Sequence, residues 1–166
     1  MNTFQELNNL LPAVLDLTSI GDHEFLIVSG AAEYLAGLGN RFGDVDIIIG
    51  PHTFNRLLKN MFQFEMKDFA GKPCRVIRVG LVDIIECEEL SWFLAPRNKN
   101  ITYPILDNEH LIKWRIAIGR DKDQLRAWQM IHQLSSRPSI PNEKVSEVKS
   151  FNQMLTGFTH TLMEMA

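Results

Sequence analysis

The feature that most constrains the fold is the alternation of short apolar runs with segments of helical periodicity. Residues 24–28 and 45–49 are apolar runs of strand length, and each ends at turn-forming residues. A segment with apolar residues at helical spacing follows each run, over 31–38 and again after Pro51. Strands that alternate with helices in this way predict an α/β (α+β) fold, with a mixed sheet covered by helices.

The rest of the chain completes this pattern. We expect an opening helix over 5–17, a hairpin formed by 62–69 and 74–79, a third strand over 81–85, and helices from residue 106 onward. Residues 1–134 are therefore the predicted domain, and 135–142 (SSRPSIPN) are the predicted linker. Residues 143–166 are predicted to form a C-terminal helix, which would pack on its own domain, on a protein partner or on a second copy of the chain.

Composition excludes several classes of protein. The chain has 166 residues, of which 45% are hydrophobic and 22% charged, as expected for a folded domain rather than a disordered chain. No apolar run approaches the roughly 20 residues of a membrane span, and a secretory signal is not expected, because the first residues carry no basic region before an apolar core. Two cysteines cannot form a disulfide framework, so a cytoplasmic location is expected. A net charge of −3 argues against a histone-like nucleic-acid binder.

The strongest chemical signal is the run of residues 43–49 (GDVDIII), where two aspartates open an apolar strand. Asp44 and Asp46 are two residues apart, so a strand places both side chains on one face. Adjacent carboxylates repel each other unless a cation lies between them, and oxygen ligands favour Mg²⁺ or Mn²⁺. Asp83 lies in another apolar run and is the expected third carboxylate, with Glu86 as the alternative. Three such carboxylates could hold two metal ions for phosphoryl transfer.

Two further features point to phosphate binding. Ser29 and Gly30 lie between a strand and a helix, where small residues leave backbone N–H groups open to a phosphate. Arg41 precedes the aspartate pair and is either a phosphate ligand or an ordinary surface residue. Residues 1–40 contain no Lys or Arg, whereas 41–126 contain 14 basic residues, so the phosphates of an RNA acceptor would be expected to meet 41–126.

In combination, these motifs resemble the polymerase-β-type nucleotidyltransferase superfamily. The resemblance rests on a strand, the turn Ser29-Gly30-x-Ala32, a short helix, residues 41–46 (RFGDVD) and a later strand with Asp83. Residues 111–123 (LIKWRIAIGRDKD) are similar to the helix pair of small bacterial nucleotidyltransferases, which include toxins of the abortive-infection type. The similarity covers roughly residues 24–134 and implies the nucleotidyltransferase fold.

The resemblance also implies an activity and its residues. Such an enzyme moves an NMP from a nucleoside triphosphate to an acceptor and releases pyrophosphate. Asp44, Asp46 and Asp83 would be the catalytic metal ligands, and Asp83 would also be the base toward the acceptor hydroxyl. The residues implied to bind the nucleotide are Ser29, Gly30, Lys113, Arg120 and Lys122. The acceptor is left open among an RNA 3′ end (for example tRNA), a protein side chain and a small molecule.

One departure from the family pattern supports an alternative. The phosphate turn of the family usually begins with Gly, whereas Ser29 occupies that place here. A serine would crowd the phosphate if the position required a positive φ. The alternative interpretation is therefore a catalytically inactive protein that uses the same fold to bind a nucleotide or to regulate a partner.

Overall fold

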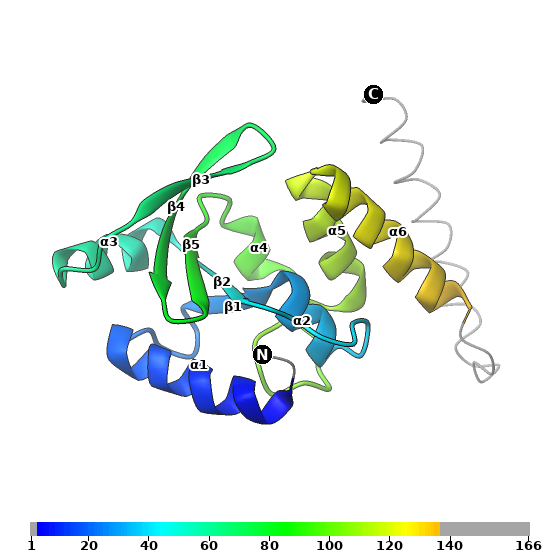
Figure 1. Ribbon diagram of the computed structural model, residues 1–166, viewed down its shortest axis with the longest axis horizontal. Coiled ribbons are helices and arrows are strands. Elements are labelled where there is room, and N and C mark those ends of the chain that lie inside the picture. The colour runs from blue at the N-terminus through cyan, green and yellow to red at the C-terminus, as the bar shows by residue number, and fades with distance from the viewer. Residues whose placement is uncertain (1–2, 137–166) are drawn as a thin grey trace.

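The computed structural model describes residues 3–136 (Figure 1). Its helices are α1 (Phe4–Thr18), α2 (Ser29–Leu35), α3 (Pro51–Lys59), α4 (Ser91–Leu94), α5 (Asn108–Ile118) and α6 (Asp121–Ser135). Its strands are β1 (Phe25–Val28), β2 (Val45–Ile49), β3 (Glu65–Phe69), β4 (Lys72–Val79) and β5 (Val82–Glu86). The predicted helix over 143–166 and most of the predicted linker lie outside the described residues.

The five strands form one mixed sheet, which confirms the predicted fold class. Their order is β1-β2-β5-β4-β3. Only β2 and β5 are parallel, whereas β1 pairs with β2, β4 with β5 and β3 with β4 in antiparallel fashion. Return from β2 to a parallel neighbour requires a crossover, which α3 and the β3–β4 hairpin provide.

Neighbouring residues of β4 show that the two faces of the sheet have different surroundings. Arg75 faces α3, where its side chain donates to Asn55 Oδ1 at 3.2 Å and its guanidinium lies 4.8 Å from the centre of the Phe54 ring. Cys74 points to the other face and lines a cavity there together with Trp114 of α5. One face therefore carries α3, and the opposite face carries the cavity.

Helix α1 shows how local sequence and packing act together. Thr3 and Glu6 form a capping box, in which each side chain accepts from the backbone N–H of the other residue. Leu7, Leu11 and Val14 are fully or almost fully buried and lie at helical spacing, so one stripe of the helix joins the core. The helix extends one residue beyond the predicted range at each end.

The hairpin was predicted at the correct place but with a longer turn. The strands are joined by two residues, Ala70 and Gly71, which have φ angles of 54° and 83°. Positive φ at both positions is the geometry whose twist matches antiparallel strands, and glycine adopts it without strain. Lys72 and Pro73, which were expected in the turn, belong to β4.

The segment after β5 was not predicted in detail. It contains the short helix α4 and then returns along the edge of the sheet, where Ile105 forms a parallel bridge with Ile27 of β1. Ile105 and Leu106 are completely buried. This segment therefore covers an edge that β1 would otherwise expose. Among residues 3–136, no helix is long and apolar enough to cross a membrane.

An ion pair joins the loop before β1 to α3. Arg56 donates two hydrogen bonds of 2.8 Å to the carboxylate of Glu24, which also accepts from the backbone N–H of Gly21 at 2.8 Å. Mainly because of the Arg56 hydrogen bonds, the pKa of Glu24 falls to about 2. The pair is about one-third exposed, so solvent screening reduces its contribution to stability.

Replacement of this carboxylate should give a pH-dependent loss of stability. Because the folded pKa of Glu24 lies below its ordinary value, the stabilisation is complete above about pH 4.5 and is lost as the pH falls toward 2. We expect Glu24→Gln to lower the free energy of unfolding by about 1 kcal/mol at pH 7. Urea titrations between pH 2 and 7 should show the difference from wild type shrinking below pH 4.5, whereas Asp22→Asn in the same loop should cause no such loss.

Candidate functional site

The sheet places three charged residues side by side on adjacent strands. Asp46 of β2 is in register with Asp83 of β5, and Asp83 is in register with Arg78 of β4. Asp44 precedes β2 by one residue and carries its carboxylate to the same group. The register therefore brings together the three aspartates that the sequence singled out. The alternative third carboxylate, Glu86, instead forms an ion pair with Arg75.

Two cations hold Asp83. Arg78 donates from Nε to Asp83 Oδ1 at 2.7 Å, and Lys67 Nζ donates to Asp83 Oδ2 at 2.9 Å. The same guanidinium reaches Asp44, with Nη2 at 2.8 Å from Oδ2. Burial alone would raise the pKa of Asp83, but the hydrogen bonds from Arg78 and Lys67 hold it below its usual value. Asp83 is therefore an ionised, ion-paired carboxylate.

Asp46 has a different environment from its two neighbours. In the part of the chain that the structure describes, no hydrogen bond or ion pair reaches its carboxylate. Burial, followed by the negative charges of Asp83 and Asp44, raises the pKa of Asp46 to about 6. The positive charges of Arg115 and Lys67 oppose this rise without a direct contact, so Asp46 is the member of the group whose carboxylate is open to a ligand.

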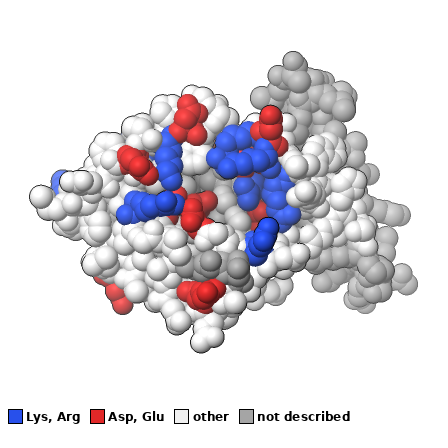
Figure 2. Space-filling view, viewed as in Figure 1, with Lys and Arg blue, Asp and Glu red and all other residues white. Residues whose placement is uncertain are grey.

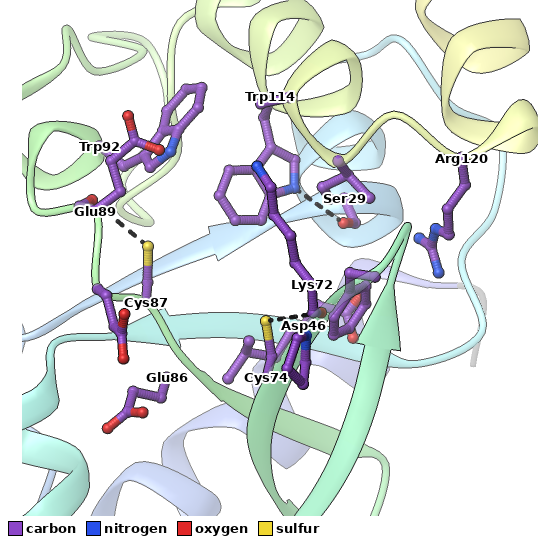
Figure 3. A pocket seen from close by; sticks show the side chains of 16 residues that line it. Ser29, Asp46, Lys72, Cys74, Glu86, Cys87, Glu89, Trp92, Trp114 and Arg120 are labelled. Carbon is purple, nitrogen blue, oxygen red and sulfur yellow. Dashed lines mark hydrogen bonds between the residues drawn. The ribbon is translucent and has the colours of Figure 1, made fainter.

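Asp46 lies at a cavity of about 350 Å³ between the sheet, the β3–β4 hairpin and α5 (Figure 3). One end of this cavity is lined by Ser29, Lys72 and Arg120, close to Asp46. The other end is lined by aromatic and acidic side chains, among them Trp92 and Glu89, and Trp114 stands between the two ends. Figure 2 shows acidic side chains near the middle of the visible face, with basic side chains on both sides of them.

Ser29 begins α2 in a strained conformation. Its φ of 58° lies in the left-handed region, which costs a non-glycine residue roughly 1 kcal/mol. The indole Nε1 of Trp114 donates to Ser29 Oγ at 3.3 Å, so the hydroxyl ties the start of α2 to α5. The first position of the turn therefore does have a positive φ, which a glycine adopts without strain and a serine does not.

A second network fixes α5 and α6 against α2. Glu33 is 1% exposed and accepts from Arg115 Nε and Arg126 Nε, both at 2.7 Å. Asp123 is completely buried and accepts from Arg115 Nη1 at 2.7 Å and from Arg120 Nε at 2.6 Å. Each buried carboxylate therefore has two arginine partners, and Arg115 joins the two halves of the network.

The predicted cationic residues are not all brought to the cavity. Arg120 lines it, whereas Lys113 of α5 forms an ion pair of 2.6 Å with Glu109, and Lys122 is exposed on the first turn of α6. Arg41 and Gly30 line a separate polar hollow of about 450 Å³. Ser29 and Gly30 thus face different cavities, and only Ser29 lies beside Asp46.

Several residues at the site were not predicted. Lys67 and Arg78 could not be linked to Asp83 from the sequence, because their contacts with it depend on strand register. Arg115 lies within the motif over 111–123, but the resemblance pointed to Lys113 as the cation of that helix. The sequence carries no clear signal for Arg115, because its partners Glu33 and Asp123 belong to other helices.

The ion pairs of Asp44 and Asp83 bear on the expected metal site of the three aspartates. Among residues 3–136, no group of three or more His, Cys, Asp or Glu side chains is arranged to hold a metal ion. The physical reason is that Lys67 and Arg78 already take both oxygens of Asp83 and one oxygen of Asp44. Only Asp46 keeps both of its oxygens free of such contacts.

The two cysteines line the cavity but are poor nucleophiles. Cys74 and Cys87 are half-buried free thiols. Burial raises the pKa of Cys74 and brings the pKa of Cys87 to about 11. Because the thiolate is the reactive form, neither residue is suited to covalent catalysis near neutral pH.

Comparison with known proteins identifies the fold. No family model matches the sequence, and no curated protein matches it. The structure is similar to a crystal structure from Thermotoga maritima of a protein provisionally described as a nucleotidyltransferase, with a TM-score of 0.50 and 13% sequence identity. The match covers 81% of this chain and 96% of that chain. The expected nucleotidyltransferase-type fold is therefore confirmed.

Two substitutions at Ser29 should separate backbone strain from the loss of its hydroxyl. Ser29→Gly and Ser29→Ala both remove the acceptor for Trp114, but only glycine tolerates a φ of 58° without strain. We expect Ser29→Gly to be more stable than Ser29→Ala by about 1 kcal/mol in urea unfolding at pH 7. Equal stabilities would show that the left-handed conformation is not retained in solution.

Removal of the carboxylate between Arg115 and Arg120 should be strongly destabilising. Asp123→Ala leaves Arg120 without its carboxylate partner and Arg115 with Glu33 alone, and we expect a loss of about 3 kcal/mol in the free energy of unfolding. Asp121→Ala, an exposed position in the same helical turn, should cost less than about 1 kcal/mol. Similar losses for the two variants would contradict the buried network.

Proposed function

We propose that this protein is a nucleotidyltransferase that moves an NMP from a nucleoside triphosphate to an acceptor. The observation that carries the proposal is the carboxylate of Asp46, which has no protein partner in the described chain and lies at a cavity of about 350 Å³. The same cavity contains Ser29 and the cations Lys72 and Arg120, on a fold shared with a protein described as a nucleotidyltransferase.

The two ends of the cavity match the two ends of a nucleotide. Lys72 and Arg120 provide positive charge for the triphosphate beside Ser29. Arg120 gives its Nε and Nη2 groups to Asp123, so the buried network orients its guanidinium while Nη1 is free of these bonds. Trp92 packs edge to face against the buried Trp114, with 5.2 Å between ring centroids, and the half-buried Trp92 would provide the ring surface for the nucleoside.

The residues at the cavity fit one Mg²⁺ or Mn²⁺ ion that arrives with the nucleotide, with ligands from both the protein and the phosphates. They fit a site built from protein ligands alone less well. Mg²⁺ is usually held by one or two carboxylates together with substrate phosphates. Asp46 would hold it, with the remaining oxygen of Asp44 as a second ligand. When bound, the ion would neutralise charge on the phosphates during transfer.

The remaining chemistry is positioning and electrostatics. The acceptor hydroxyl oxygen attacks the α-phosphorus and releases its proton to water, the bond from that phosphorus to the oxygen of the β-phosphate breaks, and pyrophosphate leaves with the electron pair. Lys72 and Arg120 would stabilise the negative charge that develops on the leaving group. Because Lys67 and Arg78 hold Asp83, we assign it to the orientation of these cations rather than to the role of base.

A second candidate function is binding without transfer. It is favoured by the ion pairs on Asp83 and by the strained Ser29, which replaces the usual glycine. A protein of this kind would bind a nucleotide in the same cavity and regulate a partner. Thermal-shift titration with each NTP, with and without Mg²⁺, followed by a transfer assay, separates the two functions. Binding with no transfer to RNA, protein or small molecules would support the second candidate.

The substitution Asp46→Asn tests the proposed activity directly. It removes the charge of the open carboxylate and should reduce NMP transfer by at least about 10³-fold. The reason is that Asp46 would hold the divalent ion that neutralises charge on the phosphates. The measurement uses α-labelled NTPs with total RNA, cell lysate or the protein itself as acceptor.

Asp16→Asn is the matched control, because this exposed aspartate of α1 does not line the cavity. It should keep wild-type activity, and circular dichroism should show that both variants are folded. Full activity of Asp46→Asn would rule out the proposed role of this carboxylate.

A further inference from the structure

We propose that Lys67 and Arg78 are built-in counterions of the aspartate cluster and limit it to a single divalent cation. This inference concerns the metal content of the site and rests on the proposed function only for its biological meaning. It differs from the sequence expectation, in which Asp44, Asp46 and Asp83 together hold two ions.

The first observation is the position of Arg78. Its backbone is paired with that of Asp83 across β4 and β5, so the two side chains are direct neighbours on the sheet. The guanidinium extends over the cluster and makes three hydrogen bonds, two to Asp83 and one to Asp44. Contacts to two carboxylates at once are the geometry by which a cation bridges them, and the planar fork of arginine suits this role.

The second observation is the position of Lys67. This residue lies on β3, at the outer edge of the sheet, and its Nζ reaches Asp83 Oδ2 at 2.9 Å. Together with Arg78 it engages both oxygens of Asp83. The side chain of Asp83 is 8% exposed, so these ion pairs are screened less by solvent than ordinary surface pairs.

The charge balance of the cluster follows from these contacts. Two side-chain cations contact Asp83 and Asp44, and Asp46 is the carboxylate of the cluster that neither cation contacts. One divalent ion can therefore bind at Asp46 without breaking an ion pair. A second ion would have to displace Arg78 or Lys67 from Asp83. Otherwise it would have to bind close to these two positive charges without a free oxygen of Asp83 as its ligand. The ion pairs therefore exclude the second ion.

Mn²⁺ binding to the full chain tests the proposal without nucleotide or acceptor. Isothermal titration and electron paramagnetic resonance of free Mn²⁺ should show no more than one ion bound to wild type. The double variant Lys67→Met, Arg78→Met removes both counterions and should bind one more ion, or bind Mn²⁺ about tenfold more tightly or better.

Arg75→Met is the matched control. This arginine lies on β4 as well, but it faces α3 and pairs with Glu86, so its loss should leave Mn²⁺ binding unchanged. If the double variant does not fold, Lys67→Met alone removes one counterion from a hairpin strand and should strengthen Mn²⁺ binding in the same direction. Two ions on the wild type, or unchanged binding in the variants, would overturn the proposal.

The outcome is independent of the proposed enzymatic activity. Mn²⁺ binding is measured without NMP transfer, so an inactive protein with the expected binding would contradict the proposed function alone. An active protein that binds two Mn²⁺ ions would contradict the role of Lys67 and Arg78 alone.

Discussion

The parallel pairing of β2 with β5 is the constraint on which the site depends. It brings Asp46 next to Asp83, although 36 residues lie between them in the sequence. Two neighbouring carboxylates at the start of buried strands are costly in free energy unless positive charge is supplied nearby. The crossover between the two strands contains the β3–β4 hairpin, and this hairpin carries Lys67 and Arg78 to Asp83. The crossover that joins the two parallel strands therefore also carries the two cations that offset the repulsion between their carboxylates.

The sequence was sufficient for the class of fold and for the location of the aspartates. The apolar runs predicted the strands at 24–28 and 45–49 within about one residue, because a strand that is buried on both faces is apolar at nearly every position. The grouping of Asp44, Asp46 and Asp83 was also predicted, since the first two share one face of a strand and the resemblance supplied the third. The strained conformation of Ser29 agrees with the condition stated for a serine in that turn.

The partners of these residues could not be predicted by the same reasoning. Arg78 meets Asp83 because β4 pairs with β5 in one particular register, and a single sequence does not contain that register. Glu33 and Asp123 are buried carboxylates whose partners lie up to 93 residues away, so a charged helix residue looks the same whether it becomes buried or exposed. Lys113 and Lys122 lie in the motif over 111–123 but do not line the cavity, and Lys113 pairs with Glu109 instead. The rotation of a helix about its axis decides which of several nearby charges reaches a cavity, and the motif does not contain this rotation.

The contact between the hairpin and the helices has a consequence for access to the cavity. Arg120, which directly precedes α6, lies over the ring of Phe69 at the end of β3, 5.1 Å from its centre, and both residues line the cavity. A cation–π contact at a partly exposed site contributes about 0.5–1 kcal/mol, which is close to the thermal energy RT. This contact is therefore weak, and a ligand that draws Arg120 toward itself would lose little free energy by giving up the ring of Phe69.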